Sequence, residues 1–376
     1  MKRILVLLSL FGILITVNCQ QTLYETIIHD GIEREYILYI PANYTGSNNV
    51  PLIFNFHGYG SNATEQMFYG DFRPISDTAG FIIVHPQGTL FNGVTHWNVG
   101  GWTIGSTVDD VGFTDALINS LSSNYSIDSS RIYATGMSNG GYMSFLLACQ
   151  LNHKIAAIAS VTGSMTPETY DNCTPVHPTP ILQFHGTSDL VVPYGGAIWT
   201  QSIDDVLQYW VSYNSCNTNP IITNLPDIDP NDGSTVTHYI YEDGIDNVVT
   251  EHYKIVGGGH TWPGSLLGGS GTNHDINASV EIWNFFLRFK LLEGILDITV
   301  SNQEVFNIYP NPTVSNITIE SNLSIPVEYN IMSVYGNVLN KGTVYPGDQV
   351  LELSMLPPNI YLISIDKYTY KIIKTR

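Results

Sequence analysis

Residues 131–150 read RIYATGMSNGGYMSFLLACQ, and this stretch decides the fold. It starts as an apolar β-type run ending at Thr135, turns through Gly136-Met137-Ser138-Asn139-Gly140, and continues as a helical run from Asn139 to Gln150. Strands that lead through short turns into helices are typical of α/β proteins. Small residues two before and two after Ser138 suit so tight a turn, because Cβ atoms at those places would clash with neighbouring backbone.

Similar apolar runs lie on both sides of this stretch. Those bounded by Gly or Pro, as buried parallel strands are, cover residues 52–56, 81–84, 155–159 and 181–184. Further helical patterns cover residues 111–122, 202–213 and 278–292. The alternation predicts a doubly wound α/β sheet, with ligands expected at the carboxyl ends of its strands.

The composition excludes several classes of protein. Of the 376 residues, 43% are hydrophobic and 12% are charged, which is too apolar for a disordered chain. The formal net charge of −19 argues against nucleic acid as a partner.

The first nineteen residues have the pattern of a secretion signal. Lys2 and Arg3 precede an apolar run from Ile4 to Val17, and the small Cys19 follows. No later run is long enough for a transmembrane segment, so we expect a soluble protein outside the cytoplasm. A lipid-anchored Cys19 is a second interpretation, although Asn18 is larger than the residue usual before a lipidated cysteine.

Charge and patterning divide the rest of the chain. Residues 20–299 hold 27 Asp+Glu against 7 Lys+Arg, whereas residues 300–376 hold 6 against 5. We therefore expect an α/β domain over 20–292, a linker over 293–303 and a C-terminal domain over 304–376. In that last domain, β-branched and aromatic runs such as 316–320 and 360–365, separated by Pro, Asn and Gly turns, predict a small all-β sandwich.

Three cysteines remain after the predicted signal. Export permits a disulfide, and we expect it between Cys149 and Cys173, which leaves Cys216 free. The alternative is that all three are buried apolar thiols.

The turn around Ser138 is typical of a nucleophile elbow, which presents a serine hydroxyl at the edge of a sheet. A serine nucleophile needs a base and a carboxylate, which follow it in this fold in the order Asp, His. Asp189 lies just past the run 181–184, and His260 lies in the glycine-rich stretch 257–264. We expect His260 to take the Ser138 proton and Asp189 to orient the imidazole. Asp109 and Asp110 precede the serine and are interpreted as helix-capping or loop-ordering groups.

Acyl chemistry also needs donors for an oxyanion. We expect them to be the backbone amides of Asn139, directly after the serine, and Tyr59, in the turn His57-Gly58-Tyr59-Gly60. Aromatic side chains in loops could line a substrate site or could pack as loop anchors. These candidates are Trp97, Trp102 and Trp262.

Several of these strings together resemble one family, the secreted esterases of the polyhydroxybutyrate-depolymerase and feruloyl-esterase-like group, which have the α/β-hydrolase fold. The resemblance runs from about residue 24 to residue 289 and rests on residues 57–60, 109–113, 136–141, 185–189 and 257–264. It implies Ser138, Asp189 and His260 as the triad of a serine carboxylic-ester hydrolase with no metal or organic cofactor. It also implies polymeric or plant-wall substrates, such as polyhydroxyalkanoate, feruloyl or acetyl xylan esters.

The tail resembles the C-terminal sorting domain of the type IX secretion system. The resemblance rests on residues 306–312, Tyr335-Gly336, and residues 360–363 with 371–374. It implies the type IX machinery as a partner and a secreted or surface-attached protein. The alternatives to an esterase are a serine peptidase, which uses the same order of residues, and a surface-displayed carbohydrate- or polymer-binding protein on an esterase scaffold.

Overall fold

The computed structural model describes residues 19–291, 306–321, 326–333, 338–365 and 368–375. Most of the predicted signal, the predicted linker and the Tyr335-Gly336 motif lie outside these residues. No helix in the described part of the chain is both long and apolar enough to cross a membrane.

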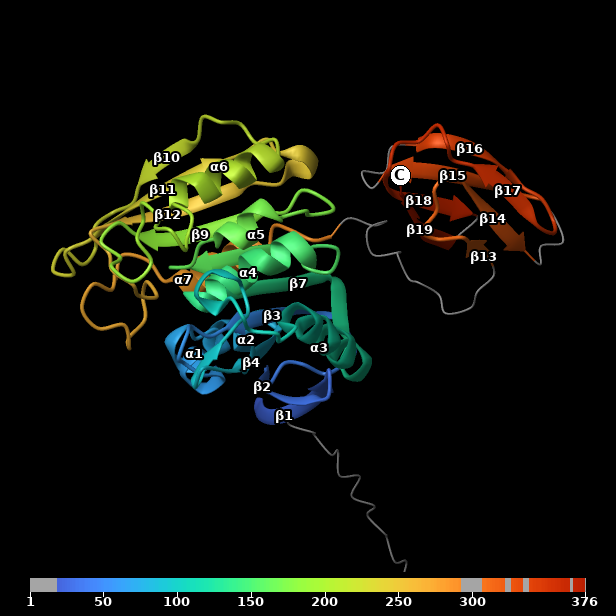
Figure 1. The fold of residues 1–376 in the computed structure, drawn as a ribbon. Coiled ribbons are helices and arrows are strands. Elements are labelled where there is room, and N and C mark those ends of the chain that lie inside the picture. The colour runs from blue at the N-terminus through green and yellow to red at the C-terminus, as the bar shows by residue number, and fades with distance from the viewer. Residues whose placement is uncertain (1–18, 292–305, 322–325, 334–337, 366–367, 376) are drawn as a thin grey trace, which may run out of the picture.

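A ten-stranded sheet organises the first part of the chain (Figure 1). In sheet order the strands are β1 (Gln21–His29), β2 (Ile32–Ile40), β4 (Ile82–Pro86), β3 (Val50–Phe56), β7 (Ile127–Met137), β8 (Ala157–Val161), β9 (Ile181–Gly186), β12 (Thr250–Val256), β11 (Thr235–Tyr241) and β10 (Ile221–Asn224). The six central strands, from β4 to β12 in this order, run parallel, and antiparallel strands extend both edges of the sheet.

Helices cover both faces of this sheet, and each face has its own apolar core. One core receives side chains from α3 (Asp110–Asn124), α4 (Asn139–Gln150) and α6 (Ile203–Tyr213). The other face is covered by α1 (Ala63–Tyr69), α2 (Arg73–Ala79) and α7 (Ala278–Phe286). The remaining elements are α5 (Pro167–Asp171), the hairpin of β5 (Thr89–Phe91) and β6 (Val94–His96), and single 3₁₀ turns at Gly101–Thr103 and Ile245–Asn247. The doubly wound sheet is confirmed.

The predicted elements agree with the observed ones except at some ends. The helix from Asn139 to Gln150 has the predicted bounds, whereas α7 ends at Phe286, before the predicted 292. After Phe286 the amides of Arg288 and Phe289 bond to carbonyls three residues back, and the Leu291 amide donates to the Ser130 carbonyl at 2.9 Å. The chain therefore leaves the helix to pack against the strand that precedes Ser138.

The C-terminal part forms two antiparallel sheets that share one core, as a sandwich does. The core takes Ile317, Ile319 and Leu351 from one sheet, and Ile331, Ile363 and Ile372 from the other. The first sheet holds β13 (Phe306–Tyr309), β14 (Asn316–Ser321) and β17 (Gln349–Glu352); the second holds β16 (Val338–Val344), β15 (Val327–Ser333), β18 (Asn359–Ile365) and β19 (Tyr368–Lys374). The expected all-β fold of the tail is confirmed.

A disulfide joins Cys149, at the end of α4, to Cys173, just after α5. The two Cα atoms lie 4.8 Å apart. Cys216 is free and buried, with its sulfur 3.8 Å from the Val248 carbonyl oxygen, and burial raises the pKa of its thiol.

Candidate active site

Ser138 lies in a strained turn between β7 and α4. Its φ of 53° and ψ of −120° are rare for a residue with a side chain. The turn is held this tightly because glycines stand on both sides. A Cβ at position 136 would lie 2.6 Å from the Phe56 carbonyl oxygen, and one at Gly140 would lie closer still. Ser138 occupies the N-cap position of α4, yet its hydroxyl makes no capping bond there.

Asp189 and His260 meet beside this turn, although 71 residues separate them. Asp189 follows β9 and His260 follows β12, and these strands are parallel neighbours, so their carboxyl ends lie at one edge of the sheet. His260 Nδ1 lies 2.7 Å from Asp189 Oδ2. The other carboxylate oxygen, Oδ1, accepts the amides of Val191 at 2.8 Å and Val192 at 2.9 Å. The buried Asp189 carboxylate is thus fixed in orientation and fixes the imidazole.

A second histidine touches the same carboxylate. His185 Nε2 lies 3.5 Å from Asp189 Oδ2, but burial lowers the pKa of His185 to about 4. Its Nε2 lies 2.9 Å from the Val192 carbonyl oxygen and its Nδ1 lies 3.0 Å from Gln183 Nε2, so we assign the proton to Nε2. The His185 imidazole is therefore neutral at pH 7, and it does not compete with His260 as a cationic partner of Asp189.

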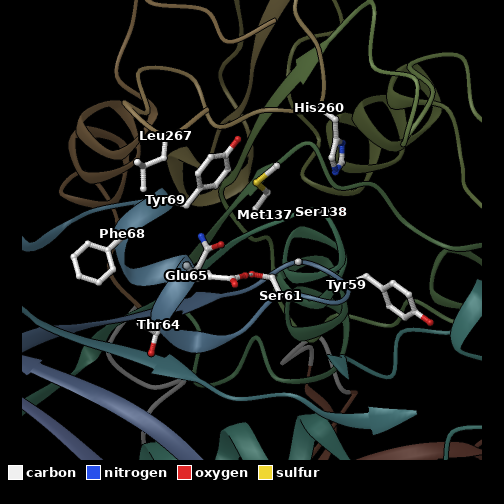
Figure 2. Close-up of a pocket in the computed structure, with 12 residues that line it drawn as sticks. Tyr59, Ser61, Thr64, Glu65, Phe68, Tyr69, Met137, Ser138, His260 and Leu267 are labelled. Atoms are coloured by element: carbon white, nitrogen blue, oxygen red, sulfur yellow. Dashed lines mark hydrogen bonds between the residues drawn. The ribbon is translucent and has the colours of Figure 1, made fainter. Parts of the chain in front are cut away.

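Ser138 and His260 line one pocket of about 520 Å³ at the carboxyl ends of the strands (Figure 2). Among the described residues, no hydrogen bond joins these two side chains, as is frequent before substrate binds. Tyr59 and Met137 flank the serine. The opposite wall comes from the loop before α1, from α1 itself and from Leu267.

The two predicted oxyanion donors belong to segments that lie close to the serine. The Asn139 amide opens α4, where helix N–H groups lack intrahelical acceptors. The turn with Tyr59 approaches closely, because a Cβ at Gly58 would lie 3.5 Å from the Ser138 Cβ. Trp97 holds both segments: its Nε1 donates to the His57 carbonyl at 2.9 Å, and its amide donates to Asn139 Oδ1 at 2.7 Å.

Substrate contact and loop anchoring are the two roles considered for the three tryptophans, and none of the three lines the Ser138 pocket. Trp97 and Trp262 are buried and line no part of the pocket. Trp262 donates through Nε1 to Ser279 Oγ at 3.1 Å, and its amide bonds the hydroxyl of Tyr69, which does line the pocket. Both side chains are loop anchors, because their large apolar rings fill the space beneath the site loops. Trp102 is half-buried and lies edge-on to Tyr59, with 6.4 Å between ring centroids.

Asp109 and Asp110, which precede Ser138 in the chain, have a structural role. Asp109 caps α3 by accepting the Gly112 amide at 2.8 Å. Asp110 forms a buried ion pair with Arg34 at 2.6 Å, and its other oxygen accepts the Asn98 amide. Asp109 also joins His29 and Asp30 in the one group of potential metal ligands found among the described residues. None of these side chains lines the Ser138 pocket.

Two parts of the chain match known families. Residues 109–217 match the phospholipase/carboxylesterase family, and residues 307–375 match the secretion system C-terminal sorting domain. Acetyl xylan esterase from Aspergillus awamori has a similar solved structure, with a TM-score of 0.52 at 16% identity over 70% of this chain and 98% of that one. The first part of the chain has the α/β-hydrolase fold.

Curated relatives of this α/β domain are named as esterases. Feruloyl esterase B of Piromyces equi is 32% identical over 198 residues, covering 50% of this chain and 37% of the relative. A bifunctional acetylxylan esterase/xylanase of Neocallimastix patriciarum is 27% identical over 256 residues, covering 68% of this chain and 33% of the relative. The chain thus spans about a third of the length of these relatives. They confirm the resemblance to feruloyl esterases, and the tail match supports a secreted or surface location.

Sequence reasoning did not identify the α1 wall of the pocket, formed by Thr64, Glu65, Phe68 and Tyr69. The available signal was Asn62 followed by Glu65, which marks a helix start directly after the His57–Gly60 turn. Asn62 does cap α1, by accepting the Glu65 amide at 2.9 Å. The helix that begins directly after the His57–Gly60 turn borders the same pocket as that turn.

Proposed function

We propose that this protein is a secreted serine carboxylic-ester hydrolase that acts through an acyl-enzyme. The observation that carries the proposal is the 2.7 Å contact between His260 and a buried, amide-held Asp189, on the wall of the pocket that Ser138 lines. A strained serine at a strand-to-helix turn supports the same chemistry.

In the proposed reaction, His260 Nε2 removes the Ser138 hydroxyl proton while Oγ attacks the ester carbonyl. The amides of Asn139 and Tyr59 stabilise the oxyanion. The intermediate collapses when His260 returns the proton to the leaving alcohol. Water, activated by the same imidazole, then releases the acid and restores Ser138. Asp189 stabilises the imidazolium, because one of its carboxylate oxygens faces His260 while the other is held by backbone amides.

We propose plant-wall esters, feruloyl or acetyl, as the substrate class. The names of the relatives support this class, and none of those named here refers to a polyhydroxyalkanoate. The pocket supports an acyl group with apolar surface, since Phe68, Tyr69, Met137 and Leu267 line it. We further propose that the α/β domain ends near residue 292 and that the tail from residue 304 engages the type IX secretion machinery, which the match to a sorting domain supports.

The test is hydrolysis of p-nitrophenyl acetate by wild type, Ser138→Ala and Asp189→Asn. Loss of the serine should abolish turnover above background. Asp189→Asn should lower kcat by about 10⁴-fold with little change in KM, because the amide favours the wrong imidazole tautomer. Hydrolysis by Ser138→Ala at the wild-type rate would contradict the proposal. Cleavage of peptide amides in place of esters would favour the peptidase alternative.

A further inference from the structure

A second cavity, of about 340 Å³, lies next to the Ser138 pocket. It is bounded by the β1–β2 hairpin on one side, and by Ala63, Thr64 and Gln87 on the other. Thr64 lines both cavities, so the first turn of α1 is the wall between them. In Figure 2 the Thr64 side chain points away from Ser138, whereas Glu65 on the same turn meets Ser61 inside the first pocket.

Four of the hairpin residues that line this cavity lie on one face of the hairpin. Tyr24 pairs with Ile37 and Thr26 pairs with Glu35 across the two strands. Residues two apart in a strand point the same way, so these four side chains form a single patch. Tyr24 is 68% exposed and Glu35 is exposed as well. Gln87 forms a fixed wall, since it accepts the Ala63 amide at 3.0 Å and donates to the Gly88 carbonyl at 3.1 Å.

This combination fits a neutral polyhydroxy ligand. An exposed aromatic ring offers an apolar face on which the C–H face of a sugar can stack, and the Glu35 carboxylate accepts hydrogen bonds from hydroxyl groups. No Lys or Arg is among the residues that line the cavity, and the Glu35 carboxylate lies on the hairpin face that it shares with Tyr24. An anionic ligand would be repelled there, whereas a neutral sugar would not.

We propose that this cavity is a subsite for the backbone of a neutral polysaccharide whose ester group occupies the Ser138 pocket. The inference rests on the proposed esterase function and specifies its substrate as an esterified carbohydrate chain, in preference to a polyester. The two cavities share Thr64, so a chain held by Tyr24 and Glu35 crosses the first turn of α1 to reach Ser138. Both volumes lie in the range of small-molecule sites.

The experiment compares two substrates that share an acyl group, p-nitrophenyl acetate and acetylated xylo-oligosaccharides. The readout is the ratio of kcat/KM for the oligosaccharide ester to kcat/KM for the aryl ester. Tyr24→Ala should lower this ratio about fivefold, equivalent to about 1 kcal/mol of lost stacking, through a higher KM for the oligosaccharide. Tyr24→Trp should keep the ratio, because the ring is retained.

Ile28→Ala is the matched control, since Ile28 is an exposed apolar residue on the same strand, outside the cavity. Its ratio should equal that of wild type. Calorimetry with unesterified xylo-oligosaccharides and Ser138→Ala gives a second measurement, in which adding Tyr24→Ala should weaken binding. An unchanged ratio in Tyr24→Ala, or an equal fall in Ile28→Ala, overturns the subsite. Absence of p-nitrophenyl acetate hydrolysis in wild type would instead overturn the esterase function.

Discussion

Each functional side chain at the Ser138 site depends on neighbours that have no chemical role. Asp189 is useful because two backbone amides occupy one of its oxygens and leave the other for His260. Ser138 protrudes because positions 136 and 140 carry no Cβ. The geometry of the Ser138 site is therefore sensitive to single atoms in residues outside the proposed triad.

Gly140→Ala tests this sensitivity. The added Cβ would overlap the Phe56 carbonyl oxygen, and backbone cannot move aside as a flexible side chain does. We expect a loss of at least about 2 kcal/mol in the free energy of unfolding, with esterase activity lost as well. Gly195→Ala is the control, since a Cβ there meets nothing within 4 Å. Urea unfolding of both variants measures the difference, and equal stabilities would contradict the steric argument.

At the scale of elements, α4 carries the serine turn at its N-terminus and a covalent link at its C-terminus. Cys149, in its last turn, is bonded to Cys173 after α5. The same helix supplies much of one apolar core, including Tyr142, Phe145 and Leu147. The position of Ser138 therefore depends on how firmly the far end of this helix is held.

Reducing the disulfide should lower the free energy of unfolding by about 3 kcal/mol, since the bond closes a loop of 24 residues in the unfolded chain. All six tryptophans lie between residues 97 and 283, so tryptophan fluorescence in denaturant reports this part of the chain alone. The double variant Cys149→Ala/Cys173→Ala should resemble reduced wild type and should not respond to reductant. Cys216→Ser should still respond. An unfolding midpoint of wild type that is the same with and without reductant would contradict the expectation.

For the whole molecule, buried histidines couple stability to pH. Burial lowers the pKa of His57 and His185 to about 4, and that of His85 and His252 to about 3. Histidine in an unfolded chain titrates near pH 6.5. Between about pH 4 and 6.5 the unfolded state therefore binds more protons than the folded state. The contribution of these histidines to the free energy of unfolding is complete above about pH 6.5 and is lost as the pH falls toward 4.

We expect each such histidine to contribute up to about 1.4 kcal/mol per pH unit to this loss. Fluorescence-monitored urea unfolding at pH 7, 6 and 5 measures the slope. Replacing one buried ring, as in His252→Gln, should flatten it, since one site no longer takes up a proton on unfolding. His274→Gln, at an exposed histidine, is the control. Identical slopes in wild type and His252→Gln would show that burial of this ring does not couple to pH.

The sequence by itself determined the features that depend on local sterics and chain order. Alternating apolar runs were enough for the α/β sheet. The pattern of Gly136, Ser138 and Gly140 was enough to predict the turn, because a Cβ at position 136 would lie 2.6 Å from the Gly140 carbonyl carbon, within the same five residues. The order Ser138, Asp189, His260 was enough to nominate the three residues.

Only the tertiary structure decided which side chains reach the site. Asp189 and His260 meet because β9 and β12 become parallel neighbours, a pairing that neither segment encodes alone. The sequence places Trp97 and Trp262 in loops, which suggested contact with substrate, but both side chains are buried. The packing of distant elements sets the exposure of a side chain. The same holds for the wall between the two cavities, because α1 places Thr64 there by packing against β2, β3 and β4.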